Sequence, residues 1–162
     1  MEKIKIGIVE DELMIAENII QTLLSLGYEV TEPATNYTAA LEMIQSEQPD
    51  LLLLDIVLSG HKDGIDLAET VKEEYNLPFI FLTSNADQGT IDRAKKLNPP
   101  SYLVKPFNRN DLFAAIELAA YTHRTSKIEA SVQKPPVEKR LKDTLFVKHN
   151  SMFFKVKYEN IC

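Results

Sequence analysis

Residues 50–60 read DLLLLDIVLSG, with four consecutive leucines between two aspartates. A run this short and this uniformly apolar predicts a strand buried on both faces, because a parallel sheet covered by helices needs no polar alternation. The run is too short to span a membrane. The strand ends on Asp55, and open α/β sheets bind their ligands at the carboxyl ends of their strands. Taken alone, Asp55 fits an ordinary turn residue equally well.

The chain on both sides of this stretch alternates between short apolar runs and helical patterns. Four more strands are predicted at residues 3–9, 28–33, 78–83 and 101–105. Helices are predicted from apolar side chains at helical spacing over residues 15–23, 37–44, 66–75, 89–97 and 112–119, the last capped by Asn108 or Asn110. Strands that alternate with helices five times predict an α/β fold, a doubly wound five-stranded parallel sheet with helices on both faces.

Composition restricts the class of protein. Of the 162 residues, 44% are hydrophobic and 26% are charged, which is enough for a core and fits one domain with a tail or two small domains. The first residues lack the apolar core of a signal peptide. The single cysteine, Cys162, excludes a disulfide framework. We therefore expect a cytoplasmic protein without membrane association.

Charge divides the chain into two parts. Residues 1–122 hold 9 Lys/Arg and 20 Asp/Glu, a net charge of −11, whereas residues 123–162 hold 9 and 4, a net charge of +5. An acidic first part repels nucleic acid, while a basic second part does not. The asymmetry indicates that the two parts have different partners.

Polar side chains follow four of the predicted strands at the point where each strand ends. In a parallel sheet these ends lie on one edge, so side chains that are distant in sequence converge there. They are Glu10 and Asp11 after the first strand, Asp55 after the leucine strand, Thr83 after the next strand and Lys105 after the last.

This set of residue types indicates phosphoryl chemistry. Three carboxylates in one pocket raise one another's pKa values, and a divalent cation removes that conflict. Oxygen ligands that include one or two carboxylates suit Mg²⁺. An Asp carboxylate can accept a phosphoryl group as an aspartyl phosphate, and Lys and Thr can bind its other oxygens. The sequence therefore predicts a phosphoacceptor site with Mg²⁺ as cofactor.

With these residues in place, the chain resembles the receiver domain of two-component response regulators. The resemblance covers residues 3 to about 122, which predicts a receiver domain at residues 1–122. It implies a flavodoxin-like sheet with strand order 2-1-3-4-5. Five motifs carry it, in order and at the spacing of the family: Val9-Glu10-Asp11-Glu12, Leu54-Asp55-Ile56, Asp63-Gly64-Ile65, Leu82-Thr83-Ser84 and Tyr102-Leu103-Val104-Lys105-Pro106-Phe107.

The resemblance implies roles for the site residues. Asp55 is the phosphorylation site and binds Mg²⁺ together with Asp11, while Glu10 binds the ion through water. The backbone carbonyl of Val57 is a further ligand. Thr83 is one of two residues that contact the phosphoryl group.

The other residue that contacts the phosphoryl group is Lys105. The Lys105–Pro106 peptide bond is implied to be cis, a conformation that is essentially confined to proline. Tyr102 is implied to move inward on activation, following Thr83. The phosphoryl donor is a sensor histidine kinase in a phosphorelay, and residues 89–121 form the switch surface, which is also the predicted homodimer or output interface.

Two positions depart from the family pattern. After the acceptor strand the family usually has Pro-Gly-x-Asp-Gly, whereas residues 59–64 read SGHKDG, one residue longer and without proline. Val57 is apolar at a position that can help to orient an attacking water. We therefore expect a long-lived phosphate on Asp55, with a half-life above about one minute.

Other α/β classes fit these residues less well. A dinucleotide-binding fold or a P-loop needs a glycine-rich turn after the first strand, where Glu10 and Asp11 would repel a phosphate. A Mg²⁺-dependent phosphatase of the haloacid dehalogenase kind also uses an Asp nucleophile, but it needs a second Asp where this chain has Val57. We expect a phosphoacceptor that catalyses at most its own phosphotransfer and dephosphorylation, and not an enzyme that acts on a metabolite.

The last forty residues predict a linker and a tail. Residues 123–140 are polar and contain two adjacent prolines, which predicts a linker. Residues 144–148 and 152–156 predict two strands of a hairpin. Residues 141–162 resemble the opening of a LytTR-type DNA-binding domain, which implies a transcriptional regulator whose DNA-reading region lies mostly beyond residue 162. The alternative is a receiver that signals through protein–protein contacts without binding DNA.

Overall fold

The fold is built on a parallel sheet of five short strands. The computed structural model describes residues 3–84, 87–99, 101–131, 144–149 and 152–157. The parallel strands stand in the order β2-β1-β3-β4-β5, which confirms the predicted order. Their bounds are Lys5–Val9 for β1, Glu29–Val30 for β2, Leu51–Asp55 for β3, Phe79–Thr83 for β4 and Ser101–Val104 for β5.

The leucine strand β3 lies at the centre of the sheet and is buried on both faces, as predicted. Its side chains alternate between two hydrophobic cores, because successive residues of a strand point to opposite faces. Leu52 and Leu54 belong to one core, and Leu51 and Leu53 belong to the other. Each fully buried leucine contributes about 1.5–3 kcal/mol relative to an exposed one.

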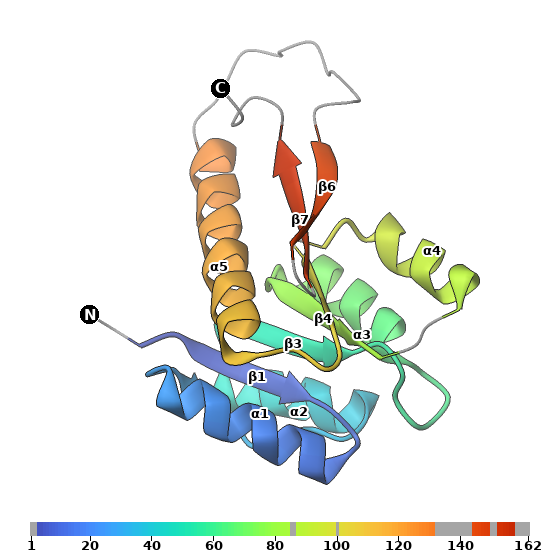
Figure 1. Ribbon diagram of the computed structural model, residues 1–162. Helices are drawn as coiled ribbons and strands as arrows, with labels where there is room; N and C mark the ends of the chain where they lie inside the picture. Colours follow the sequence, from blue (N-terminus) through green and yellow to red (C-terminus); the bar gives the residue numbers. More distant parts are fainter. Residues whose placement is uncertain (1–2, 85–86, 100, 132–143, 150–151, 158–162) are drawn as a thin grey trace.

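Helices cover both faces of the sheet (Figure 1). The face of Leu51 and Leu53 is covered by α1 and α5, which place apolar side chains such as Leu23 and Ile116 in that core. The opposite face is covered by α2, α3 and α4. The helix bounds are Leu13–Ser25 for α1, Tyr37–Glu47 for α2, Gly64–Thr70 for α3, Gln88–Lys96 for α4 and Arg109–Ser131 for α5.

Helix α3 begins two residues earlier than predicted and changes its winding before it ends. Asp63 caps it by accepting hydrogen bonds from the backbone N–H groups of Ile65 and Asp66, at 3.0 and 2.9 Å. The helix continues as a π-helical turn, η1 (Val71–Tyr75). Apolar periodicity detects neither feature, because the cap lies outside the periodic residues and a single wide turn hardly alters the spacing.

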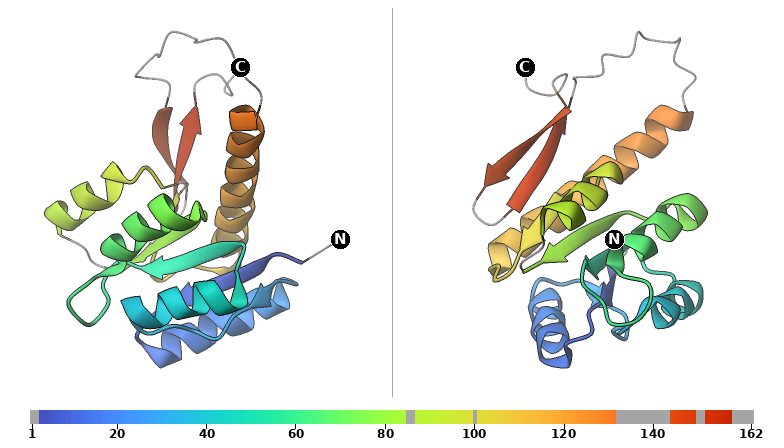
Figure 2. Two further views of the ribbon diagram at one scale, coloured as in Figure 1. Left: turned by 180° about the vertical axis from the view of Figure 1, so that it is seen from behind. Right: turned by 90° about the vertical axis from the view of Figure 1, so that its right-hand side faces the viewer.

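Helix α5 is longer than predicted, and it continues through residues 123–131 of the predicted linker (Figure 2). Asn108 is its cap, since its side chain accepts a hydrogen bond from the N–H of Asp111 at 2.8 Å. The prediction ended the helix where its apolar stripe ends. No glycine or proline stands between residues 107 and 134, however, so no helix breaker ends the helix at residue 122.

The predicted hairpin is present as β6 (Thr144–His149) and β7 (Met152–Lys157), which pair antiparallel. Strand β7 also pairs antiparallel with β5, so the tail joins the edge of the sheet, which the sequence did not predict. An edge strand offers unpaired backbone groups to such an addition. Among the described residues, no helix is both long and apolar enough to cross a membrane.

Candidate functional site

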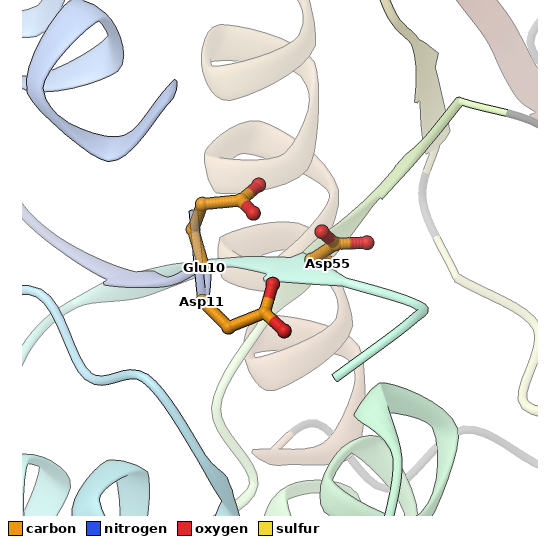
Figure 3. A group of neighbouring side chains, drawn as sticks. All are labelled: Glu10, Asp11 and Asp55. Carbon is orange, nitrogen blue, oxygen red and sulfur yellow. The ribbon is translucent and has the colours of Figure 1, made fainter. Parts of the chain in front are cut away.

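Three carboxylates meet at the carboxyl edge of the sheet, where β1 and β3 end (Figure 3). Strands β1 and β3 are neighbours in register, with Val9 opposite Leu54, so the residues that follow them lie close together. Ligand atoms of Glu10, Asp11 and Asp55 all lie within 4.8 Å of one another. The predicted convergence of these three side chains is therefore present in the structure.

Lys105 joins this cluster from the end of β5. Its Nζ donates to Glu10 Oε2 at 2.6 Å and to Asp55 Oδ2 at 3.1 Å. Its side chain is only 12% exposed, and that of Glu10 is fully buried. The partly buried ammonium group of Lys105 thus partly neutralises two of the three carboxylates.

Burial and crowding shift the pKa values of this pair. Burial raises the pKa of Glu10 to about 7, and the neighbouring Asp55 adds to the rise, while the hydrogen bond from Lys105 opposes it. Burial lowers the pKa of Lys105, but its hydrogen bonds to Glu10 and Asp55 outweigh this, so its pKa is raised overall. The lysine therefore stays charged, whereas Glu10 can exchange a proton near neutral pH.

The loop after β3 holds the acidic side chains in place. The N–H of Val57 donates to Asp55 Oδ1 at 3.0 Å, and the N–H of Ser59 donates to Asp11 Oδ2 at 3.2 Å. Val57 itself is exposed, at 61% of its full accessible surface. The role of the Ser59 N–H could not be predicted from the sequence, because every residue except proline has a backbone donor.

Thr83 and Lys105 stand side by side at the ends of β4 and β5. The N–H of Lys105 donates to the carbonyl of Thr83 at 2.7 Å, and the Lys105–Pro106 peptide bond is cis. Thr83 is half-buried and lines a cavity of about 420 Å³ beneath α4. The remaining lining residues are Ile56, Gln88, Ile91, Lys95, Tyr102 and Val104.

Tyr102 lies inward in this structure. It is 8% exposed, and its ring stacks on Phe81 with centroids 5.9 Å apart. Burial raises the pKa of its phenol to about 12. Because the ring is already inside, its movement on activation stays a prediction.

The donor set fits a hard divalent cation. It consists of carboxylate oxygens at one open edge of the sheet, and Mg²⁺ prefers such ligands while keeping several waters. The Asp55 side chain is 8% exposed and lies next to an ammonium group at the end of the central strand. This geometry suits a carboxylate nucleophile whose negative charge must be balanced as it reacts.

The comparison with family models agrees with this geometry. Residues 6–117 match the model of the response regulator receiver domain. The chain belongs to the response regulator receiver family. This receiver is 33% identical over 120 residues to the transcriptional regulatory protein PdtaR of Mycobacterium tuberculosis, an alignment that covers 74% of this chain and 58% of PdtaR. The chain thus spans less than two thirds of the length of that relative.

Solved receiver structures have the same architecture. The signal receiver domain of a modulated diguanylate cyclase from Desulfovibrio desulfuricans is 36% identical, with a TM-score of 0.74, and the match covers 77% of this chain and 99% of that one. A CheY-like receiver protein from Methanospirillum hungatei is 27% identical, with a TM-score of 0.70 and coverage of 77% and 99%. NtrX of Brucella abortus is 25% identical, with a TM-score of 0.73 and coverage of 82% and 30%.

Proposed function

We propose that this receiver takes a phosphoryl group on Asp55 from a sensor histidine kinase and thereby switches an output. The observation that carries the proposal is the placement of the Asp55 carboxylate at the end of the central strand, within 4.8 Å of ligand atoms of two other carboxylates and 3.1 Å from Lys105 Nζ. A surface turn residue would need neither the acidic neighbours nor the buried ammonium. Membership of the receiver family supports the kinase as donor.

The proposed cofactor is Mg²⁺. Asp11 and Asp55 would hold the ion directly, Glu10 through water, and the backbone carbonyl of Val57 would complete the set. When bound, the ion supplies positive charge to the phosphoryl oxygens. The close approach of the three carboxylates supports this assignment, because a divalent cation would balance their negative charge.

The transfer forms one bond and breaks another. An Asp55 carboxylate oxygen attacks the phosphorus of the kinase phosphohistidine, and an O–P bond forms as the P–N bond breaks. The electron pair of the P–N bond returns to the imidazole nitrogen, which takes a proton. Lys105 binds a phosphoryl oxygen of the new aspartyl phosphate, and the Thr83 hydroxyl binds another.

The switch follows from the same contacts. The added phosphate attracts Thr83 and Lys105, which lie at the ends of neighbouring strands, and Tyr102 responds to the position of Thr83. The surface of residues 89–121 is the proposed homodimer or output interface. Pairing of β7 with β5 brings the tail onto this surface, which supports its role in output.

The receiver catalyses at most its own phosphotransfer and dephosphorylation. A phosphatase of the haloacid dehalogenase kind needs a second carboxylate two residues after the nucleophile. The apolar, exposed Val57 stands there, so we do not propose that activity.

The proposed output is transcription in the cytoplasm. The name of PdtaR, a transcriptional regulatory protein, supports it, as does the basic C-terminal part of the chain. DNA contact through a LytTR-like region mostly beyond residue 162 belongs to this proposal. The alternative output is a protein–protein contact without DNA.

The proposal is tested by intact mass after incubation with Mg²⁺ and acetyl phosphate. The parent protein should gain one phosphoryl group, and Asp55→Asn should gain none because the amide is a poor nucleophile. Uptake by the folded Asp55→Asn variant would place the acceptor elsewhere. No uptake by the folded parent, with acetyl phosphate or with a phosphorylated kinase, would contradict the proposed function.

A further inference from the structure

Helix α4 is tied to α3 by one arginine. Arg93 Nη1 lies 2.9 Å from Asp63 Oδ2, and Nη2 lies 3.3 Å from Asp66 Oδ1, so the planar guanidinium holds two carboxylates at once. The two helices lie side by side in Figures 1 and 2. The contact joins residues 30 and 27 positions apart in the chain.

The two carboxylates are the capping box of α3. Asp63 accepts hydrogen bonds from the first turn, and Asp66 accepts one in return from the N–H of Asp63 at 2.9 Å. Burial raises the pKa of Asp63, but the backbone hydrogen bond of Asp66 and the contact with Arg93 outweigh it, so the pKa is lowered overall. Arg93 therefore binds the two side chains that cap α3, and these are themselves held by the backbone of its first turn.

The start of α3 is in turn fixed to the acceptor strand. The N–H of Gly64 donates to the carbonyl of Ile56 at 3.0 Å. A Cβ at Gly64 would stand only 1.9 Å from the backbone oxygen of Asp55, so the two backbones are in direct contact. A displacement of the first turn of α3 therefore also displaces the backbone of Asp55.

Helix α4 has few other attachments. Ala94 is its one buried residue in a helix that the structure describes completely. A cavity of about 420 Å³ lies between α4 and the sheet. At its C-terminal end, Lys72 Nζ donates to the carbonyl of Leu97 at 2.6 Å. With so little apolar packing, polar contacts have a large share in the position of α4.

We propose that Arg93 is a positioning residue that ties α4 to the end of the acceptor strand through the cap of α3. This rests on the proposed function in one respect: phosphorylation of Asp55 then reaches α4 by two routes, through Thr83 and β4 and through α3. By reciprocity, loss of the tie also changes the response of α3 to phosphorylation.

The test is amide hydrogen exchange of the full chain, followed by mass spectrometry on peptides that cover α4 and the first turn of α3. Arg93→Gln should exchange faster in both segments by about two- to five-fold, the size expected for a partly exposed ion-pair network. Phosphorylation by acetyl phosphate should alter exchange in the first turn of α3 less in this variant than in the parent.

Matched variants separate the tie from a general loss of charge. Lys96→Gln removes the same charge from an exposed position of the same helix and should leave both segments unchanged. Arg93→Lys should restore part of the protection, because lysine keeps the positive charge but lacks the planar guanidinium whose two nitrogens bind the two carboxylates. In the double variant Asp66→Asn/Arg93→Gln, the loss of protection against amide exchange should be smaller than the sum of the losses in the two single variants.

Two results would overturn the tie. One is that Arg93→Gln has the same amide exchange rates as Lys96→Gln in both segments. The other is that Arg93→Gln accelerates α4 alone while the first turn of α3 keeps its protection. If the parent takes up no phosphoryl group, the proposed function is contradicted instead. Amide exchange in the unphosphorylated variants would then still test the contact of Arg93 with Asp63 and Asp66.

Discussion

At the scale of single residues, Lys105 has two tasks that exclude each other in time. In the structure it neutralises Glu10 and Asp55. In the proposed phosphorylated state it binds the phosphoryl group instead. The side chain must therefore leave at least one carboxylate when the phosphate arrives, and its long flexible stem allows this.

Replacement of this lysine should separate folding from signalling. Lys105→Ala should keep the fold, since Glu10 can hold a proton when its ammonium partner is lost. It should lose charged hydrogen bonds worth roughly 1.5–3 kcal/mol each. The effect of phosphorylation on the equilibrium of the switch surface should therefore fall at least about tenfold. The measurement is the change in amide exchange over residues 89–121 on phosphorylation, compared between the parent and Lys105→Ala.

Lys96→Ala serves as the control, because that residue is exposed on α4. A Lys105→Ala variant that is phosphorylated and responds over residues 89–121 like the parent would show that the role assigned to Lys105 is wrong.

Residue types at strand ends could be predicted because topology alone gathers them. Glu10, Asp55 and Lys105 follow three strands, and the parallel sheet brings them to one edge. The tie from Arg93 to Asp63 and Asp66 could not be predicted in this way. It joins two helices through the directions of their side chains, which hydrophobic periodicity does not report.

At the scale of elements, α3 is placed by a backbone contact that only glycine permits. The Cβ of any other residue at position 64 would lie within 1.9 Å of the Asp55 oxygen. The motif Asp63-Gly64 after the acceptor strand is therefore a physical requirement of this packing. In the sequence it was visible only as part of a family pattern.

Substitution of this glycine should destabilise the protein. Gly64→Ala forces α3 away from β3 and should cost about 1–3 kcal/mol of the free energy of unfolding. Gly89→Ala is the matched control, since its Cβ would meet only the Asp87 side chain at 3.4 Å and it lies in a helix. Urea unfolding of both variants measures the free energy of unfolding. Equal values for the two would contradict the close packing of Gly64 against Asp55.

The lengths of the elements were predicted less well than their order. Strand β2 has only two residues, although six were predicted. Beyond Val30 the N–H groups of Thr31 and Ala34 still donate to β1, but Pro33 has no N–H with which to continue a regular ladder. Helix α5 runs to Ser131 because the sequence has no helix breaker between residues 107 and 134. Periodicity reports burial, and these element ends are not set by burial.

At the scale of the whole molecule, the acidic edge links stability to pH and to Mg²⁺. Without metal, the folded protein binds a proton on Glu10 below about pH 7, while the unfolded chain does so only near its ordinary pKa of 4.5. This contribution to stability is complete below pH 4.5 and is lost as pH rises through about 7. Bound Mg²⁺ requires the ionised carboxylate, so its stabilising effect has the opposite pH dependence.

Thermal unfolding with and without Mg²⁺ at pH 8 and pH 6 measures this linkage. At subsaturating Mg²⁺, affinity should fall roughly tenfold per pH unit below about 7, which is up to about 1.4 kcal/mol less stabilisation at pH 6. In Glu10→Gln the pH dependence of the Mg²⁺ effect should be largely lost. An equal rise in Tm at both pH values for the parent would contradict the assignment of Glu10.

The two-sided burial of β3 has a consequence for the chain before it folds. Leu51 to Leu54 form a short segment of high hydrophobicity without charge, the kind that self-associates into cross-β aggregates when exposed. Asp50 and Asp55 flank it, and charges in such places act as gatekeepers against aggregation. We therefore expect the charge of the proposed phosphoacceptor Asp55 also to limit aggregation of the newly made chain, so Asp55→Asn should give a lower yield of folded protein than the parent.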